Sequence, residues 1–510
     1  QIVGGGTNAV AARSAPLPAN DLDCPAGGVL VETGIDENGN GILDSDEVDK
    51  AEKVCNGTNG LQALLLLSDE DIGPNCPVGG VRVDSGIDTD RNGILDAEEI
   101  TETKFVCNPG RDRLFEAKEK LTAFDPEAQD SFGASVAISE NYAIVGAHLE
   151  DPDALLSAGS AYIFRRTGTN TWDAGIKIVA PDREENDRFG VSVAISGDYV
   201  IVGAQLEDPD LGSGEIDTAG AAYIFRRTGT NTWDDGTKIT AFDPEASDLF
   251  GLSVAISGDY AIVGALQEDP DLGAGPINQA GAAYIFRRTG LNTWDTGTKI
   301  ISLETQLNGR FGSAVAISGD YALVGASGEN SGGSAYVFQR TGDNAWAFVT
   351  KIAAPAISGG FGSAVSISGD YALIGMPFEL DPILGGQTGA AYVYRRTENN
   401  SWDAGTKIVS PDLEVDDQFG SKVGLSGNTA IFGVSGKDLD AKNSAGAAYI
   451  FQRTDLNAWD TGTKITATDG EALDFFGTSV AISGNTAIVG ANGKDLPGPI
   501  DNVGAAYIVR

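Results

Sequence analysis

The sequence predicts a mainly β protein: a seven-bladed β-propeller of four-stranded antiparallel blades, with its ring closed by an N-terminal strand, preceded by a small cysteine-containing module. Three observations lead to this fold class. A Phe-Gly dipeptide recurs seven times at intervals of 50 to 61 residues. Glycine supplies 68 of the 510 residues, which favours many tight turns between short strands. Two similar segments, each with two cysteines, precede the first Phe-Gly.

The composition excludes several classes of function. The chain carries 34 Lys and Arg against 73 Asp and Glu, a net charge of −39, so nucleic acids and anionic membrane surfaces are poor partners. The longest apolar candidate, Leu64–Leu67, is far shorter than the roughly 18 residues of a transmembrane helix, so we expect no membrane insertion. The chain has a single histidine, His148, which excludes triads and histidine-based metal sites. We therefore expect a protein that is not an enzyme.

Each repeat has the same expected order of strands. In the second repeat, Phe189-Gly190 leads into residues 192–196, a Gly-Asp pair and residues 199–204. Two β-branched runs separated in this way are typical of a hairpin with a two-residue primed turn, because glycine adopts the positive φ that the turn needs. A third strand is expected at 220–227, and a fourth after Trp233. The seven copies begin at Phe132, Phe189, Phe250, Phe311, Phe361, Phe419 and Phe476.

The two ends of the repeat region predict how the ring closes. The seventh repeat stops at Arg510, within its third strand, so its fourth strand is missing. Residues 120–130 nearly duplicate residues 238–248, and Phe115 stands five residues ahead of Lys120. We expect this N-terminal strand to complete the last sheet of the same chain, which leaves no open sheet edge. The alternative is that it completes the last sheet of another molecule, giving a swapped chain or a fibre.

The pattern FGxSVAISGDYAIVGA…GAAYIFRR…W…KI resembles the FG-GAP repeat of integrin α-type propellers, in the variant common in bacterial secreted and surface proteins. The resemblance covers roughly residues 111–510 and implies a seven-bladed propeller. Integrin-type repeats often carry an Asp-rich calcium loop between the first two strands. Here that place holds only Gly-Asp or Gly-Asn, as at Gly258-Asp259, so the resemblance implies no calcium at these turns.

Two twelve-residue loops before the propeller have the ligand spacing of EF-hand calcium loops. Oxygen donors occupy positions 1, 3, 5, 9 and 12, a backbone carbonyl serves at 7, and glycine stands at 6 for the sharp turn. We therefore expect Ca²⁺, with a pair of acidic turns as the alternative. The segments before the loops are strand-like, and residues 45–54 and 97–106 are predicted to be helical. The expected ligands are Asp36, Asn38, Asn40, Ile42, Asp44 and Glu47 in the first loop, and Asp88, Asp90, Asn92, Ile94, Asp96 and Glu99 in the second.

Four cysteines bracket the two loops. Cys24 and Cys55 recur as Cys76 and Cys107, each displaced by 52 residues, which favours the disulfides Cys24–Cys55 and Cys76–Cys107 among three possible pairings. Disulfides imply an oxidising compartment, and a reduced intracellular chain is the alternative. We expect a secreted chain, extracellular or at the cell surface, whose signal peptide has been removed.

These features divide the chain into three parts. Residues 1–20 are small, Pro-containing and aperiodic, and we expect a flexible arm or one that docks on a neighbouring molecule. Residues 21–110 form the tandem calcium-loop module, with repeats at 24–57 and 76–110. Residues 111–510 form the propeller. The unit of residues 21–110 is similar to small Cys-bracketed calcium-loop repeats of bacterial secreted proteins.

The segment between the second and third strands is the variable part of each repeat. It spans residues 205–219 and 266–280 in two repeats but only 327–332 in the fourth. Several copies carry an acidic cluster such as Glu207–Asp210. Three interpretations of these clusters are open: they hold cations, they pair with a basic partner, or they form a solvated rim. Paired arginines after the third strand are expected to meet neighbouring acids, the tryptophans to be structural anchors, and His148 to be an exposed loop residue.

Three functions fit these expectations. The first is a non-catalytic extracellular calcium-binding adhesion protein that binds protein or glycan through the propeller loop face. The second is a structural subunit of a filament or surface layer, assembled through the N-terminal arm or module. The third is a carboxylate-based polysaccharide-active enzyme, which needs acids at a defined separation in a pocket.

Overall fold

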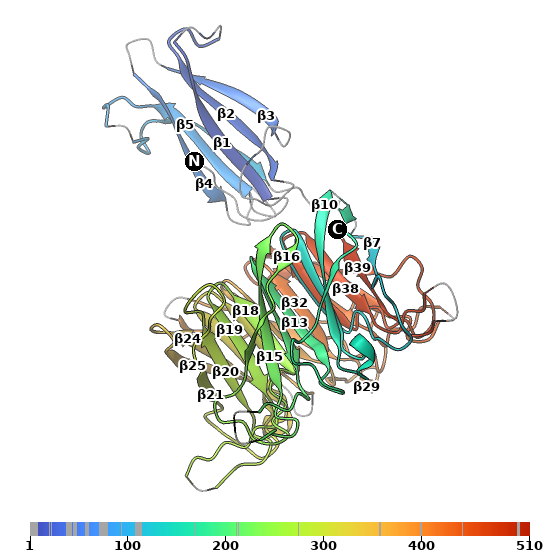
Figure 1. Cartoon of the computed structure of the whole chain (residues 1–510). Coiled ribbons are helices and arrows are strands. Elements are labelled where there is room, and N and C mark those ends of the chain that lie inside the picture. Colours follow the sequence, from blue (N-terminus) through green and yellow to red (C-terminus); the bar gives the residue numbers. More distant parts are fainter. Residues whose placement is uncertain are drawn as a thin grey trace. The chain divides into compact units, whose positions relative to one another are not determined.

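A computed structural model gives the fold (Figure 1). It describes residues 9–19, 21, 23–36, 43, 48–56, 61–70, 80–92, 94–107, 115–168, 170–210, 212, 214–273, 275–355, 359–397, 400–440, 442–496 and 500–510. The chain divides into two compact units, one containing Gln1–Leu114 and the other nearly all the remaining residues. No helix in the described ranges is long and apolar enough to cross a membrane.

The larger unit consists of seven antiparallel sheets, which confirms the predicted blades. Blade 1 has β8 (Ser135–Ser139), β9 (Tyr142–Ala147), β10 (Ser160–Gly168), β11 (Thr171–Trp172) and β12 (Ile176–Ile178), and blade 2 has β13 (Phe189–Ser196), β14 (Tyr199–Ala204), β15 (Ala221–Gly229), β16 (Thr232–Trp233) and β17 (Thr237–Ile239). Blade 3 has β18 (Ser253–Ser257), β19 (Tyr260–Ala265), β20 (Ala282–Arg287) and β21 (Thr298–Ile301), and blade 4 has β22 (Phe311–Ser318), β23 (Tyr321–Ala326), β24 (Ser334–Arg340) and β25 (Trp346–Ala353).

The last three blades follow the same order. Blade 5 has β26 (Val365–Ser368), β27 (Tyr371–Met376), β30 (Ala390–Arg395) and β31 (Thr406–Ile408), with the small ribbon β28 (Leu380–Asp381) and β29 (Gly386–Gln387) in its loop. Blade 6 has β32 (Lys422–Ser426), β33 (Thr429–Val434), β34 (Ala447–Asp455), β35 (Ala458–Trp459) and β36 (Thr463–Ile465), and blade 7 has β37 (Ser479–Ser483), β38 (Thr486–Ala491), β39 (Ala505–Val509) and β7 (Ala117–Leu121). The described helices are two short 3-10 turns, η1 (Pro152–Ala154) and η2 (Glu329–Ser331).

The Phe-Gly dipeptide begins each blade for two physical reasons. Phe189 is fully buried in the apolar layer between blades 1 and 2. Gly190 has a φ of 93°, and a Cβ there would lie 2.3 Å from the carbonyl oxygen of Ser160. A side chain at this position would therefore strain the backbone and collide with the neighbouring strand. The motif marks the place where one blade packs against the next.

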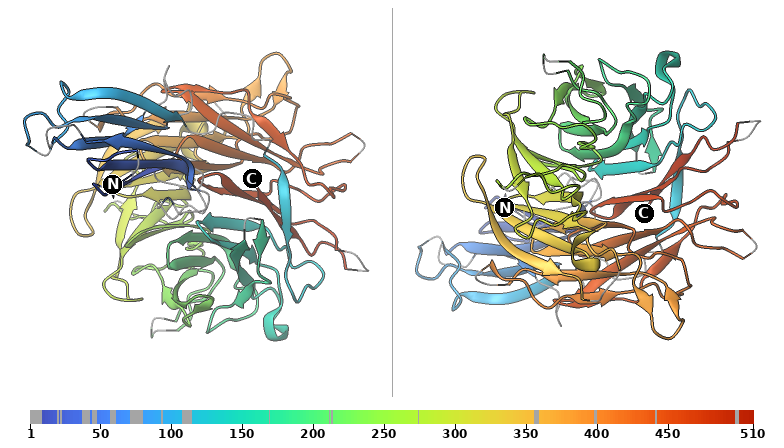
Figure 2. Two further views of the ribbon diagram at one scale, coloured as in Figure 1. Left: turned by 90° about the horizontal axis from the view of Figure 1, so that it is seen from above. Right: turned by 90° about the horizontal axis from the view of Figure 1, so that it is seen from below.

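The ring closes within the chain. β7 pairs with β39, with Leu121 opposite Ala506, so the N-terminal strand completes the last sheet as predicted. Ser479 in blade 7 donates a hydrogen bond of 2.7 Å to the carbonyl oxygen of Gly133 in blade 1. Ser192 makes the same contact with Gly251 between blades 2 and 3. In Figures 1 and 2, β7 (cyan) lies beside the red strands of blade 7.

The smaller unit contains two three-stranded antiparallel sheets. The first has β1 (Ala9–Leu17), β2 (Gly28–Asp36) and β3 (Val48–Cys55), and the second has β4 (Ala63–Glu70), β5 (Gly80–Ile87) and β6 (Ile100–Cys107). The sheets pack through Val31, Val81 and Val83, with other apolar side chains around them. Each sheet corresponds to one of the 52-residue sequence repeats.

Two predictions for this unit are wrong. Residues 45–54 and 97–106 were expected to be helical, but Val48–Cys55 and Ile100–Cys107 are strands. Alternate side chains of these segments face the other sheet, and this packing outweighs the helical preference of their Lys, Glu and Ala residues. The expected arm also contains strand β1, where Ala9–Leu17 pairs along its whole length with β2. This part of the arm belongs to the module's own sheet and is not free to dock elsewhere.

Candidate functional site

The second acidic loop joins β5 to β6 and brings three predicted ligands together. One carboxylate oxygen each from Asp88, Asp90 and Glu99 lies within 4.8 Å of the others. Asp88 and Glu99 are buried, whereas Asp90 is exposed. Asp88 follows the end of β5, and Glu99 immediately precedes β6. The hairpin strands therefore hold the first and last ligands of the loop side by side.

Backbone amides of the loop turn toward these carboxylates. One Glu99 oxygen accepts hydrogen bonds from the Thr89 backbone N–H (2.6 Å) and hydroxyl (2.7 Å), and these bonds lower the pKa of Glu99. The Asn92 N–H donates to Asp90 (3.0 Å), and the Asn92 amide donates to Asp96 (2.9 Å). Asn92 and Asp96 are exposed at the edge of the cluster, as is the Ile94 side chain. The arrangement keeps Glu99 ionised and suits a hard cation that takes oxygen ligands.

Apart from Asp36 and Leu43, the first loop lies outside the described residues. Among its predicted ligands, Asp36 ends β2, but its side chain is not described. The other predicted ligands lie outside the described residues: Asn38, Asn40, Ile42, Asp44 and Glu47. The disulfide predicted to bracket this loop is present, because Cys24 and Cys55 are joined with a Cα–Cα distance of 5.0 Å. The second predicted disulfide also lies outside the described part, because Cys76 is not described and Cys107 is described only as the last residue of β6.

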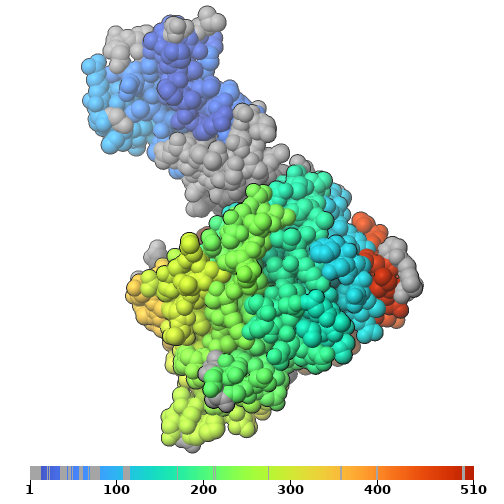
Figure 3. All heavy atoms as spheres, viewed as in Figure 1, coloured from blue at the N-terminus to red at the C-terminus, as the bar shows by residue number. Residues whose placement is uncertain are grey.

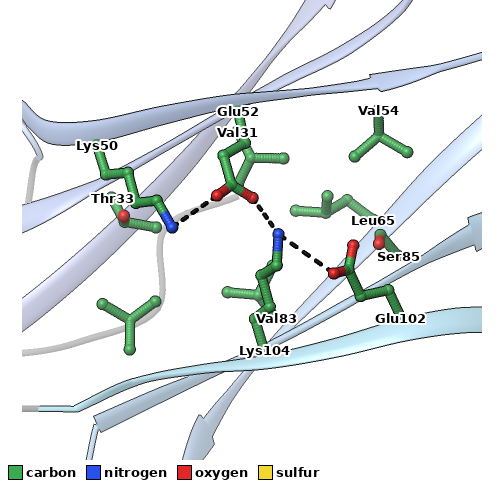
Figure 4. A pocket seen from close by; sticks show the side chains of 11 residues that line it. Val31, Thr33, Lys50, Glu52, Val54, Leu65, Val83, Ser85, Glu102 and Lys104 are labelled. Atoms are coloured by element: carbon green, nitrogen blue, oxygen red, sulfur yellow. Dashed lines mark hydrogen bonds and ion pairs between the residues drawn. The ribbon is translucent and has the colours of Figure 1, made fainter.

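A cleft lies between the two sheets of the module (Figure 4). Its floor is apolar and includes Val31 and Val83. Four charged side chains form a chain across it, in which Lys50 contacts Glu52, Glu52 contacts Lys104, and Lys104 contacts Glu102. Glu52 and Lys104 occupy equivalent positions in the two sequence repeats. Because each of the four charges has a partner of opposite sign, we interpret the cleft as the loosely filled core of the sandwich.

The acidic clusters of blades 1 to 3 are only in part a solvated rim, because the first glutamate of each is buried and the last aspartate is exposed. In blade 2, Glu207 forms an ion pair with Lys238, which also contacts Asp182 at 2.9 Å. The Tyr223 hydroxyl donates to Asp182 at 2.7 Å. Blades 1 and 3 repeat this set, with Glu150 and Glu268 as the buried glutamates. These acids hold the second-to-third-strand loop against the end of the fourth strand.

The structure also tests the expectations for the arginine pairs, the tryptophans and His148. In blades 2, 3 and 5 the second arginine of the pair meets an acid as expected. Arg227 contacts Asp198 and also lies 4.6 Å from the centre of the Tyr142 ring. Trp233 packs edge-on against the same ring, which is the structural anchoring expected of the tryptophans. His148 is not exposed but half-buried, and burial lowers its pKa to about 4.

A polar pocket lies among three connections of blades 3 and 4. Those connections are the β17–β18 and β21–β22 links and the long loop between β19 and β20. In Figure 3 this part of the chain (yellow-green) projects at the lower edge of the propeller. The pocket is lined by Ala246, Ser247, Gln267, Asp269, Asn278, Gln279, Leu307 and Asn308. Sequence reasoning singled out the loop 266–280 but not this pocket, because its residues come together only when three separate connections are placed by the fold.

The amide side chains of the pocket are available for a ligand. Those of Gln267, Asn278, Gln279 and Asn308 make no hydrogen bond to any described residue. Asp269 is committed to the loop itself, because it accepts the Gln279 backbone N–H at 2.6 Å. An amide offers both a donor and an acceptor. The pocket therefore suits a neutral ligand rich in hydroxyl groups better than an ion.

The comparisons with known proteins agree with the two-part organisation. A domain of unknown function, DUF7151, matches twice in the N-terminal unit, at residues 12–55 and 63–107. No curated protein matches the chain. A solved structure, the periplasmic gluconolactonase PpgL of Pseudomonas aeruginosa, is 12% identical with a TM-score of 0.41, over 80% of this chain and 97% of its own. A likeness of this size carries no argument about function.

The repeats of the larger unit match a known family throughout. The FG-GAP repeat matches at residues 115–164, 172–225, 233–286, 294–338, 346–394, 402–451 and 459–509. These seven matches correspond to the seven blades, each beginning near the fourth strand of the preceding blade and ending in the third strand of its own. The protein belongs to the FG-GAP repeat family.

Proposed function

We propose that the chain is a non-catalytic extracellular protein that binds a glycan or protein ligand at the loop face of its propeller and binds calcium in its N-terminal module. The polar pocket of blades 3 and 4 carries this proposal. Its four amide side chains have no hydrogen-bond partner among the described residues. Exposed Leu307 adds an apolar contact beside them. Amides next to an apolar surface match the hydroxyl groups and the C–H face of a sugar, so a glycan is favoured over a protein.

Two features of the module support the rest of the proposal. The convergence of Asp88, Asp90 and Glu99 supports calcium in the second loop. The disulfide between Cys24 and Cys55 supports an oxidising, extracellular location. Extracellular calcium modules bind at about 10⁻⁴–10⁻³ M, so the expected role of the ion is structural. In this role calcium stiffens the module that carries the propeller, and it does not report a change in calcium concentration.

The proposal is tested by displaying the full chain against glycan and protein arrays in calcium buffer. We expect binding to neutral, hydroxyl-rich glycans that is lost in the double variant Asn278→Ala, Asn308→Ala. Asn186→Ala is a matched control, because Asn186 has the position of Asn308 in blade 2 and a similar left-handed backbone (φ 73° against 58°). Absence of binding on both arrays, or equal binding by the pocket variant and the control, contradicts the proposal.

A further inference from the structure

One position of the propeller carries either glutamate or lysine, depending on the blade. It lies seventeen residues after the Phe-Gly glycine in every repeat. A second position, two residues before the Phe of the same dipeptide, carries aspartate or glycine. The first position is Glu150, Glu207, Glu268, Glu329, Glu379, Lys437 and Lys494 in blades 1 to 7, and the second is Asp130, Asp187, Asp248, Gly309, Gly359, Asp417 and Asp474.

In blades 6 and 7 the lysine places its ammonium group in a cage of oxygens. Lys437 Nζ lies 2.9 Å from Asp417 Oδ2 and 2.7 Å from the backbone oxygen of Asp412. Lys494 Nζ lies 3.0 Å from Asp474 Oδ2 and 2.6 Å from the backbone oxygen of Asp469. Both lysine side chains are almost completely buried. These two blades show that the site holds a cation between a carboxylate and a carbonyl.

In blades 2 and 3 a second carboxylate takes the place of the ammonium. Oε1 of Glu207 accepts a hydrogen bond from Lys238, and Oε1 of Glu268 accepts one from Lys299. The Oε2 atom of each glutamate is buried and has no hydrogen-bond partner among the described residues. Their side chains are only 7% and 4% exposed. A buried carboxylate oxygen without a partner is costly, so this oxygen calls for a positive partner.

The neighbouring aspartates lack the counter-charge that lysine supplies elsewhere. Asp187 and Asp248 are buried, and burial, together with the charges of Glu207 and Glu268, raises the pKa of each to about 7. A glutamate side chain is one atom shorter than lysine, so its carboxylate stops short of the ammonium position. The repeat gives the backbone carbonyls of Asp182 and Asp243 the place that those of Asp412 and Asp469 have in blades 6 and 7, so the inferred set is two carboxylates and one backbone carbonyl, which suits Ca²⁺.

The charges of the clusters show which kind of cation is needed. In blade 6, Asp412 and Asp417 are balanced by Lys437 and Lys464. In blade 2, Lys238 contacts Asp182 and Glu207, and Asp187 lies near Glu207 as a third carboxylate, which leaves two negative charges when all three are ionised. Glu184 in blade 2 and Glu414 in blade 6 occupy the same place, so they add equally to both clusters and do not change the difference in charge. The difference between the clusters equals the charge of one divalent ion.

We propose that blades 2 and 3 each bind a divalent cation such as Ca²⁺ at the position of the lysine ammonium in blades 6 and 7. The ligands are Asp187, Glu207 and the backbone oxygen of Asp182 in blade 2, and Asp248, Glu268 and the backbone oxygen of Asp243 in blade 3. These sites are separate from the calcium loops of the N-terminal module. They lie beneath the long loops that follow β14 and β19 and fix the base of each loop.

Three other blades lack one part of the site. In blade 1 the second oxygen of Glu150 accepts a hydrogen bond from Ser160, where blades 2 and 3 have alanine. In blade 4 Glu329 contacts Ser302, Tyr336 and Lys351, and glycine replaces the aspartate. In blade 5, Gly359 replaces the aspartate as well. The proposal therefore assigns two propeller sites to the chain.

Equilibrium dialysis of the full chain with calcium tests the proposal by counting bound ions. The background is Glu99→Gln, which weakens the second module loop and makes the propeller sites easier to count. On this background, Glu207→Lys with Glu268→Lys copies blades 6 and 7, and we expect it to bind two fewer Ca²⁺ per chain. The reverse change, Lys437→Glu, should bind one more. The pair Glu207→Gln, Glu268→Gln serves if the lysine variant does not fold, and it should also lose two ions.

Two results overturn the proposal. One is an unchanged number of bound ions in a double variant that keeps the native tryptophan fluorescence. The other is a double variant that alters only the pH dependence of stability, which would show that Asp187 and Glu207 share a proton and not a metal ion. Glu329→Gln is the matched negative control, and we expect it to leave the count unchanged.

Discussion

Single residues of the propeller combine burial with charge in a repeated arrangement. In most blades a tyrosine hydroxyl donates to an aspartate that also contacts a lysine, as with Tyr223, Asp182 and Lys238. The lysine lies 5.8 Å from the centre of the tyrosine ring. Such buried networks stabilise the fold only while every member is paired. The clusters of blades 2 and 3 break this rule, because one oxygen of Glu207 and one of Glu268 have no partner among the described residues. The pH dependence of their stability follows from the pKa values of the neighbouring Asp187 and Asp248.

The first prediction concerns the pH dependence of stability without calcium. The pKa of Asp187 and Asp248 is about 7 in the folded chain and about 3.9 in an unfolded one. The folded state therefore binds more protons between these values, so the free energy of unfolding falls as the pH rises from 5 to 8. Urea unfolding followed by tryptophan fluorescence reports on the propeller alone, because all six tryptophans lie there.

The control is the variant Asp187→Asn, Asp248→Asn, whose amides cannot lose a proton. We expect it to lose clearly less stability over this pH range than the natural chain does. His148 acts in the opposite direction, because its pKa of about 4 lies below the unfolded value, but it does so equally in both proteins. Parallel pH profiles for the variant and the natural chain would show that these aspartates do not titrate as described.

A second prediction at this scale concerns Glu99. Its carboxylate is held by Thr89 and lies beside Asp88 and Asp90. Glu99→Gln removes the last predicted ligand of the second loop, so calcium should protect residues 80–107 from limited proteolysis in the natural chain and protect them much less in the variant. Equal cutting with and without calcium in the natural chain would rule out this loop as a site. Glu98→Gln is the control, because Glu98 is exposed and is not a predicted ligand.

At the scale of elements, the ring depends on one strand that comes from the far end of the sequence. β7 supplies the fourth strand of blade 7, and its Leu121 is buried between blades 7 and 1. Leu121→Ala should lower the free energy of unfolding by about 2–4 kcal/mol, because it removes buried methyl groups and leaves a cavity. Leu303→Ala, at a position that is 65% exposed, should change it by less than about 0.5 kcal/mol. Similar values for the two variants in urea unfolding would mean that β7 is not needed for closure.

The elements also show how far sequence alone can predict this protein. The blades were predictable because Phe-Gly, Gly-Asp and the apolar runs act locally and repeat seven times. The strand at Val48–Cys55 was not, because its partner β2 and the opposite sheet decide its conformation. Asp88, Asp90 and Glu99 could be found from their fixed spacing. Gln267 and Asn308 could not, because they meet only when separate loops are placed by the ring. Aligning the repeats could have revealed the exchange of Glu207 for Lys437.

At the scale of the whole molecule, the two units are stabilised by different means. The described disulfide and the EF-hand-like loops belong to the N-terminal unit, and all four cysteines precede the propeller. Reduction should therefore destabilise the module, by roughly 4 kcal/mol for a loop the length of Cys24–Cys55, while the tryptophan-monitored transition of the propeller stays in place. Differential scanning calorimetry with and without reductant measures both transitions. A reductant-induced shift of the propeller transition would contradict this separation.

The central claim is that the propeller binds its ligand through the polar pocket of blades 3 and 4. The most direct test is a crystal structure of the full chain with the strongest ligand from the arrays, grown in calcium. The claim predicts ligand density against the amides of Gln267, Asn278 and Asn308, with hydroxyl groups within hydrogen-bond distance. Ligand density at another place on the propeller, or in the N-terminal module, would contradict it.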